Sequence, residues 1–175
     1  MSHHPKSYSV TTVAAFAAAV AFVPAAAVAE EPSLTYETVL TDLQDPWDMA
    51  FLPDGTMFYT EKCDGLSVRL PSGEINALLG MGDTDGYAST EDDLFCEGQA
   101  GMNGVAIDPD FDENRYVYVY SASSITAPGS NRVLRLTVND DFTEVADRTD
   151  IVEDIPYKPE ATDQPFGGPG AHNGG

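Results

Sequence analysis

The sequence predicts an all-β fold, and within that class a β-propeller of which this chain holds about two blades. Turn residues recur every few positions, and the part of the chain after residue 29 has no long stretch of helical periodicity. A strand–turn–strand pattern also occurs twice, at residues 46–62 and 102–121, where Ala50 falls on Ala106 at an offset of 56 residues. Repetition of a unit of this size is typical of propellers.

Each repeat is expected to contain four strands. The segments PWDMAFLPDGTMFYTEK and MNGVAIDPDFDENRYVYVYS each predict a hairpin, because Pro-Asp with Asp-Gly or Asp-Glu-Asn is turn chemistry and YVYVY alternates with the period of a strand. Third strands follow at 66–70 and 133–136, and fourth strands at 75–79 and 150–156. A two-sheet sandwich would explain the alternation, but not the repeated hairpin.

The end of the chain falls in register with the start of a blade. Asn103-Gly104 matches Asn173-Gly174 at an offset of 70 residues, which places His172 just before the innermost strand of a third blade. A closed ring of four to eight such units needs roughly 240 to 500 residues. We therefore expect residues 30–175 to be the N-terminal portion of a longer propeller domain.

Residues 1–29 have the composition of a secretory signal peptide. Lys6 precedes an alanine-rich apolar run, and Ala27-Val28-Ala29 is a small-x-small cleavage site before Glu30. The alternative is a membrane anchor, but Pro24 and the weakly apolar alanines argue against a stable span. We expect a periplasmic or secreted protein with no membrane span after cleavage.

The chain is strongly acidic. Its formal net charge is −21, and loss of residues 1–29 would remove one lysine and no acid. Such a charge repels nucleic acids and anionic lipids, so neither is an expected partner. The acidic stretch at residues 83–93 lacks the alternating ligands and closing glutamate of an EF-hand loop. We therefore interpret it as a solvated acidic loop and not as a calcium site.

The chain has two cysteines, Cys63 and Cys96. An exported protein meets an oxidising environment, and two cysteines allow one bridge but not a structural zinc site. The prediction is a Cys63–Cys96 disulfide, with two free thiols as the alternative.

Two motifs resemble those of the glucose and sorbosone dehydrogenase family, which are soluble quinoproteins. The run GQAGMNGVAIDPDFDENRYVYVYS, residues 98–121, is similar to the family's GQxGLLGxAxxPDF pattern, and GAHNGG, residues 170–175, is similar to its histidine followed by x-G-G. PWDMAFLPDGTMFYTEKC with LFCEGQ is most similar to the aldose or pyranose dehydrogenase branch.

This resemblance implies a six-bladed propeller that oxidises the anomeric hydroxyl of an aldose sugar to the lactone, with pyrroloquinoline quinone as hydride acceptor. It also implies calcium, which holds the quinone in such enzymes, and an external electron acceptor. The ligands of the quinone and of calcium are expected beyond Gly175. No cofactor ligand and no metal ligand is therefore assigned within this chain.

Two residues match positions with roles in the family. His172 matches the histidine that takes the proton from the anomeric hydroxyl, and Gln99 matches the glutamine that hydrogen-bonds the sugar. Ala171 stands where the glucose-specific branch carries an acid, so the resemblance does not imply a preference for glucose.

The chemistry of the residues agrees with these roles. Imidazole titrates near neutral pH, which suits a base that accepts a hydroxyl proton as hydride leaves. A lone histidine in a glycine loop is also a common exposed surface residue, and Gln99 could simply be a turn residue. Two classes of function therefore remain: a sugar-oxidising enzyme, and a non-catalytic exported propeller that binds a carbohydrate or a protein.

Overall fold

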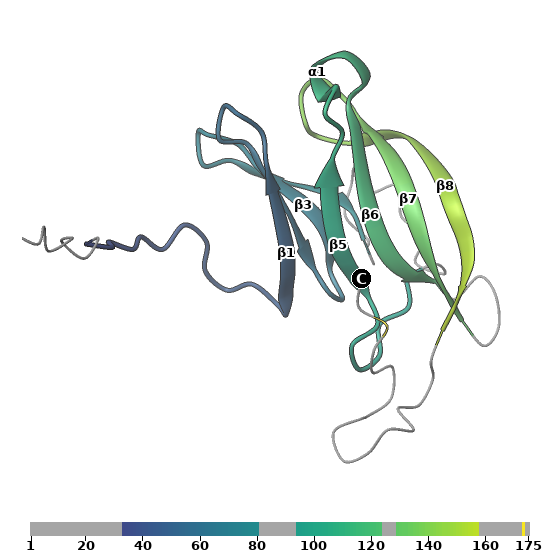
Figure 1. Ribbon diagram of the computed structural model, residues 1–175. Helices are drawn as coiled ribbons and strands as arrows, with labels where there is room; N and C mark the ends of the chain where they lie inside the picture. Colours follow the sequence, from purple (N-terminus) through teal and green to yellow (C-terminus); the bar gives the residue numbers. More distant parts are fainter. Residues whose placement is uncertain (1–32, 81–93, 124–128, 158–172, 174–175) are drawn as a thin grey trace, which may run out of the picture. The chain divides into compact units, whose positions relative to one another are not determined.

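The computed structural model describes residues 33–80, 94–123, 129–157 and 173 (Figure 1). Its regular structure consists of two four-stranded antiparallel sheets and one helical turn, which confirms the all-β prediction. Residues 33–37 belong to a separate unit, and both sheets belong to the unit that starts at Thr38. No helix within the described ranges is long and apolar enough to cross a membrane.

The first sheet is a simple meander in which each strand pairs with the next one along the chain. Gly55 turns the chain between the first two strands with a φ of 92°, which a residue with a Cβ rarely adopts. The strands of this first blade are β1 (Pro46–Phe51), β2 (Met57–Glu61), β3 (Gly65–Arg69) and β4 (Ile75–Leu79).

The second sheet repeats the same order. The predicted Asp-Glu-Asn turn between its first two strands forms the one-turn helix α1 (Phe111–Asn114), which ends where Arg115 adopts a left-handed φ of 61°. The strands of this second blade are β5 (Met102–Ile107), β6 (Tyr116–Ser123), β7 (Ser130–Val138) and β8 (Val145–Pro156).

The register of the strands confirms the internal repeat. Ala50 of β1 pairs with Phe58, and Ala106 of β5, its counterpart in the repeat, pairs with Tyr118. Both hairpins are thus built on the same pairing. The two sheets are two blades of a β-propeller.

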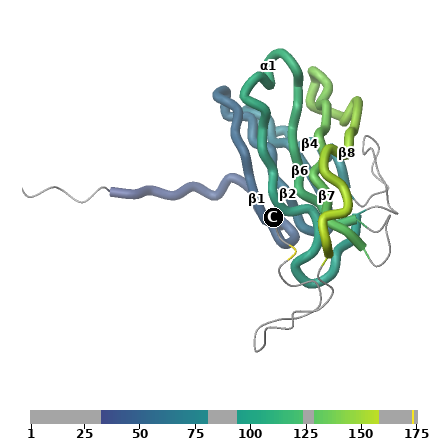
Figure 2. Tube along the Cα trace, turned by 45° about the vertical axis from the view of Figure 1, so that its right-hand side comes forward, coloured from purple at the N-terminus to yellow at the C-terminus, as the bar shows by residue number. Residues whose placement is uncertain are grey.

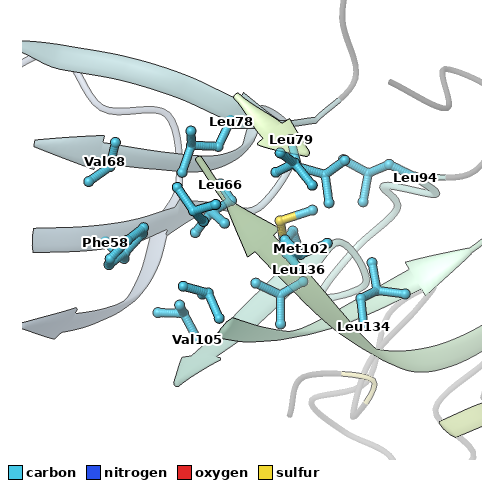
Figure 3. Close-up of a cluster of buried hydrophobic side chains, with 14 of the residues drawn as sticks. Phe58, Leu66, Val68, Leu78, Leu79, Leu94, Met102, Val105, Leu134 and Leu136 are labelled. Carbon is cyan, nitrogen blue, oxygen red and sulfur yellow. The ribbon is translucent and has the colours of Figure 1, made fainter. Parts of the chain in front are cut away.

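Alternation along β6 follows the expected period of two. Val117 and Val119 are buried, whereas the tyrosines between and beside them are half-buried. The third strands behave alike, since Val68 of β3 and Leu134 of β7 are both buried. All four valine and leucine side chains belong to one apolar cluster, in which Figure 3 shows Val68 and Leu134 among others of both blades.

The third and fourth strands of the second blade are both longer than predicted, since β7 spans Ser130–Val138 where the sequence predicts 133–136. The sequence predicts the last strand of the second blade at 150–156, but β8 begins at Val145, which pairs with Val138 of β7. Residues 146–149 carry no apolar alternation, because β8 lies at the edge of its sheet and none of these four residues is buried. Backbone pairing with β7 extends the strand, and the pattern of side chains does not reveal such pairing.

The blades meet along their first strands, where β5 contacts β1 and β2. The chain enters β5 through the segment 94–101, and α1 follows the other end of β5 (Figures 1 and 2). Segment 94–101 therefore lies at the end of the blades where β2 finishes and β3 starts. It carries Gln99 and Cys96.

Candidate active site

Segment 94–101 runs along the end of β6. Leu94 forms a β-bridge with Ser123, the Phe95 amide donates to the Ala122 carbonyl at 3.1 Å, and the Ala122 amide donates to the Gly101 carbonyl at 2.9 Å. These bonds fix both ends of the segment to the second blade. Gln99 lies between them and is exposed, so its side chain is accessible from solvent.

An aromatic contact supports the start of the same segment. The rings of Phe95 and Tyr157 meet edge to face, with their centroids 5.3 Å apart. Burial raises the pKa of the Tyr157 hydroxyl, and the negative charge of Glu97 adds to that effect. The tyrosine therefore stays neutral at physiological pH and acts here as a packing residue.

The structure joins Cys63 and Cys96 by a disulfide, with their Cα atoms 5.4 Å apart. Cys63 lies in the turn between β2 and β3, so the bond ties that corner of the first blade to the segment that enters the second. Gln99 follows three residues after Cys96. The disulfide therefore limits how far the predicted sugar-binding segment can move.

Lys62 contacts the segment with both its backbone and its side chain. Its carbonyl accepts a hydrogen bond from the Met102 amide at 2.9 Å, and its ammonium donates to the Gly98 carbonyl at 2.8 Å. A Cβ on Gly101 would lie 2.3 Å from the Lys62 carbonyl oxygen, which is closer than atoms can approach. Glycine is therefore required at position 101.

Asn103 is a buried residue near the start of β5. Its side-chain nitrogen donates to the Gln99 carbonyl at 3.2 Å, and its own carbonyl accepts a hydrogen bond from the Thr60 hydroxyl. The recurrence of Asn-Gly at the start of successive blades was the available signal, but it gave no indication of which groups the amide would hold.

His172, the predicted base, lies outside the described residues. Its neighbour Asn173 is described, and it is buried with its side-chain oxygen 3.1 Å from the Asn131 side-chain nitrogen. Asn173 and its counterpart Asn103 are thus both buried amides. Of the two residues with predicted catalytic or sugar-binding roles, the structure describes Gln99 alone.

The charges near Gln99 bear on whether this segment could hold a quinone cofactor. Pyrroloquinoline quinone carries several carboxylates, and their recognition calls for cations that are not already paired. The cation that lies against this segment is Lys62, and it is already bonded to Asp45 and Gly98. The Lys62 ammonium is therefore not available to a carboxylate of the quinone.

The described ranges contain no group of three or more histidine, cysteine or acidic side chains arranged to hold a metal ion. The acidic residues Asp83, Asp85, Glu91, Asp92 and Asp93 lie outside those ranges.

Sequence comparison connects this arrangement to known proteins. The profile of the glucose / sorbosone dehydrogenase family matches residues 43–169. Aldose sugar dehydrogenase YliI of Escherichia coli K12 is 27% identical over 139 residues, which is 78% of this chain and 35% of that protein. An uncharacterized Synechocystis protein is 31% identical over 108 residues, which is 61% of this chain and 26% of that protein.

Solved structures share the fold. The PQQ-bound aldose sugar dehydrogenase of Streptomyces coelicolor superposes with a TM-score of 0.55 at 22% identity, covering 69% of this chain and 34% of that one. A Thermus thermophilus structure, described as a putative oxidoreductase (glucose dehydrogenase), gives 0.53 at 27% identity, covering 70% and 33%.

The chain thus spans about a quarter to a third of the length of the relatives that it matches. The family match covers both blades and the segment that carries Gln99. This chain belongs to the glucose / sorbosone dehydrogenase family.

Proposed function

We propose that this chain contributes to a sugar dehydrogenase that oxidises the anomeric hydroxyl of an aldose to the lactone. Family membership supports the reaction class. The relative YliI is named an aldose sugar dehydrogenase, and the Streptomyces coelicolor enzyme that shares the fold was solved with PQQ bound. The structural observation that carries the proposal is the exposed Gln99 on a segment fixed at both ends.

In this proposal Gln99 binds and orients the sugar. Its amide offers a donor and an acceptor, which matches a sugar hydroxyl. On one side of Gln99, Cys96 forms the disulfide with Cys63. On the other side, the Gly101 carbonyl accepts a hydrogen bond from the end of β6. A polar group presented from a fixed backbone loses little freedom when the sugar binds, and this lowers the cost of orienting the substrate.

His172 is proposed as the general base. It accepts the proton of the anomeric hydroxyl as the hydrogen on the same carbon leaves with its electron pair, so that the carbon–oxygen bond becomes a carbonyl. Pyrroloquinoline quinone, when bound, supplies the acceptor for that pair, and calcium is proposed to hold it. The proposed ligands of both lie beyond Gly175.

The surroundings of the protein form part of the proposal. The leader-like residues 1–29 and the Cys63–Cys96 disulfide support export to the periplasm or secretion. We further propose that the 175-residue polypeptide alone is inactive, because a base and a sugar-binding amide cannot complete hydride transfer without the groups that hold the acceptor.

The test is dye reduction by the full-length gene product, reconstituted with quinone and calcium and supplied with aldoses. His172→Ala should lower kcat by at least ~100-fold and leave quinone binding nearly unchanged. The ascending limb of the kcat/KM pH profile near the imidazole range should also disappear in this variant. If His172→Ala keeps most of its turnover with quinone bound, the catalytic role is wrong, and a sugar- or protein-binding propeller becomes the better hypothesis.

A further inference from the structure

We propose that Lys62 is a positioning residue for the side-chain amide of Gln99. Lys62 belongs to the first blade and holds residues 97–102 at the start of the second blade. It affects the reaction only through Gln99. This inference rests on the proposed function, since it requires that Gln99 bind the sugar. Nothing in the motifs that identify the family assigns a role to Lys62.

The side chain of Lys62 bridges two groups at the junction of the blades. Its ammonium lies 3.2 Å from the Asp45 carboxylate and donates to the Gly98 carbonyl at 2.8 Å. The lysine side chain is 15% exposed, whereas that of Asp45 is 70% exposed. A largely buried ammonium bonded to a carbonyl gives a stronger contact than a neutral donor would.

The backbone of Lys62 contacts the other side of the same segment. Its carbonyl accepts from the Met102 amide at 2.9 Å and lies against Gly101, while its own amide donates to the Asp45 carbonyl at 3.1 Å. Lys62 therefore contacts the segment at residue 98 and again at residues 101–102. Gln99 lies between these two points of attachment.

The ammonium contact holds a part of the segment that the disulfide and the asparagine do not reach. The disulfide attaches the segment at Cys96, and the Asn103 side chain donates to the Gln99 carbonyl. The residues Glu97, Gly98 and Gln99 are all exposed, so apolar packing does not fix them. The direction of the Gln99 side chain therefore depends on polar contacts, including those to its own backbone and to that of Gly98.

The first test measures steady-state kinetics of the reconstituted full-length product with Lys62→Met, which keeps the length of the side chain and removes the ammonium. KM for the sugar should rise about tenfold, while kcat stays within about twofold, because the base is not displaced. Lys62→Arg keeps a donor and a positive charge and should restore KM to within about threefold of the parent value. Arg69→Met removes one positive charge from the far end of β3 and should change neither constant.

A second measurement reports the segment itself. Hydrogen exchange at the amides of residues 97–101 should speed up in Lys62→Met and return toward the parent rate in Lys62→Arg. The double variant Lys62→Met/Gln99→Ala should raise KM by no more than Gln99→Ala alone, because both changes remove the same contact with the sugar. If Lys62→Met does not fold, Asp45→Asn gives the same test, with a smaller rise in KM expected because Asp45 is exposed.

The outcomes separate this inference from the proposed function. If Gln99→Ala raises KM while Lys62→Met changes neither KM nor exchange, the positioning role is wrong and the role of Gln99 stands. If Gln99→Ala leaves KM unchanged, the proposed role of Gln99 fails and the inference fails with it, even where Lys62→Met speeds exchange. A loss of kcat in Lys62→Met at constant KM would also overturn the positioning role.

Discussion

The Val105 amide of the second blade donates a hydrogen bond to the Asp48 carboxylate of the first, with 3.0 Å between the nitrogen and Oδ2. The other carboxylate oxygen accepts from the Met49 amide at 2.8 Å, and the Asp48 amide donates to the Thr60 hydroxyl at 3.2 Å. One side chain thus joins the innermost strands of two blades, β1 and β5. This bond contributes to the stability of the blade junction from which segment 94–101 is presented.

Asp48→Ala should destabilise the chain by about 1–2 kcal/mol, because it removes a charged acceptor and leaves the Val105 amide without it. Urea unfolding followed by circular dichroism would measure the change. Asp147→Ala is the matched control, since it removes one negative charge from β8. Equal unfolding midpoints for the two variants would show that the bond between the blades contributes nothing measurable.

Replacement of both cysteines by serine should lower stability by about 3 kcal/mol, because the Cys63–Cys96 bond joins residues separated by 33 positions and so closes a loop in the unfolded chain. The measurement is again urea unfolding, with the parent protein in reductant for comparison. Oxidation in the exported protein is checked by alkylation after denaturation without reductant, and two reactive thiols per chain would contradict the disulfide.

Asp150 should make stability depend on pH. Its carboxylate lies 2.6 Å from Arg132 Nη1 and 3.0 Å from Arg148 Nε. Burial on its own opposes ionisation, but the hydrogen bonds and charges of the two arginines outweigh it, so the pKa of Asp150 lies below its ordinary value of 3.8. A lowered folded-state pKa stabilises the fold above the unfolded-state value, and this stabilisation is lost as the pH falls through the folded-state pKa.

Asp150→Asn should therefore cost about 2–3 kcal/mol near pH 7, since it leaves two mostly buried arginines without their acid. The difference from the parent should shrink as the pH drops below about 4. Unfolding midpoints measured from about pH 7 down to about pH 3 would show this, with Asp147→Asn on the same strand as control. A difference that does not vary with pH would rule out the ionised carboxylate as the cause.

Gln99→Ala should weaken sugar binding more than it slows turnover. A hydrogen bond to the substrate is present before the transition state as well as in it, so its loss raises KM and changes kcat little. Steady-state kinetics of the reconstituted full-length product would separate the two constants. Gln99→Glu keeps the length of the side chain and one acceptor, and it should fall between the parent and the alanine variant. A drop in kcat with KM unchanged would assign Gln99 to the chemical step.

The sequence by itself determined the class of fold and the order and approximate position of its strands. Val117 and Val119 alternate with tyrosines along β6, and Ala50 and Ala106 recur in equivalent hairpins, because the spacing of apolar residues along one strand reports which side of the sheet is buried. The motif predicts a sugar-binding role for Gln99, and that role stays a prediction. Because the chain has only two cysteines, any disulfide within it has to join Cys63 to Cys96.

The tertiary structure decided which groups join the two blades near Gln99. Lys62 reaches Gly98 across 36 positions of sequence, Thr60 reaches Asn103 across 43, and Asp48 reaches Val105 across 57. Such contacts depend on how one blade packs against the next, and side-chain periodicity within a strand carries no information about that distance or direction. Lys62 and Asn103 make these contacts only when the two blades are packed together.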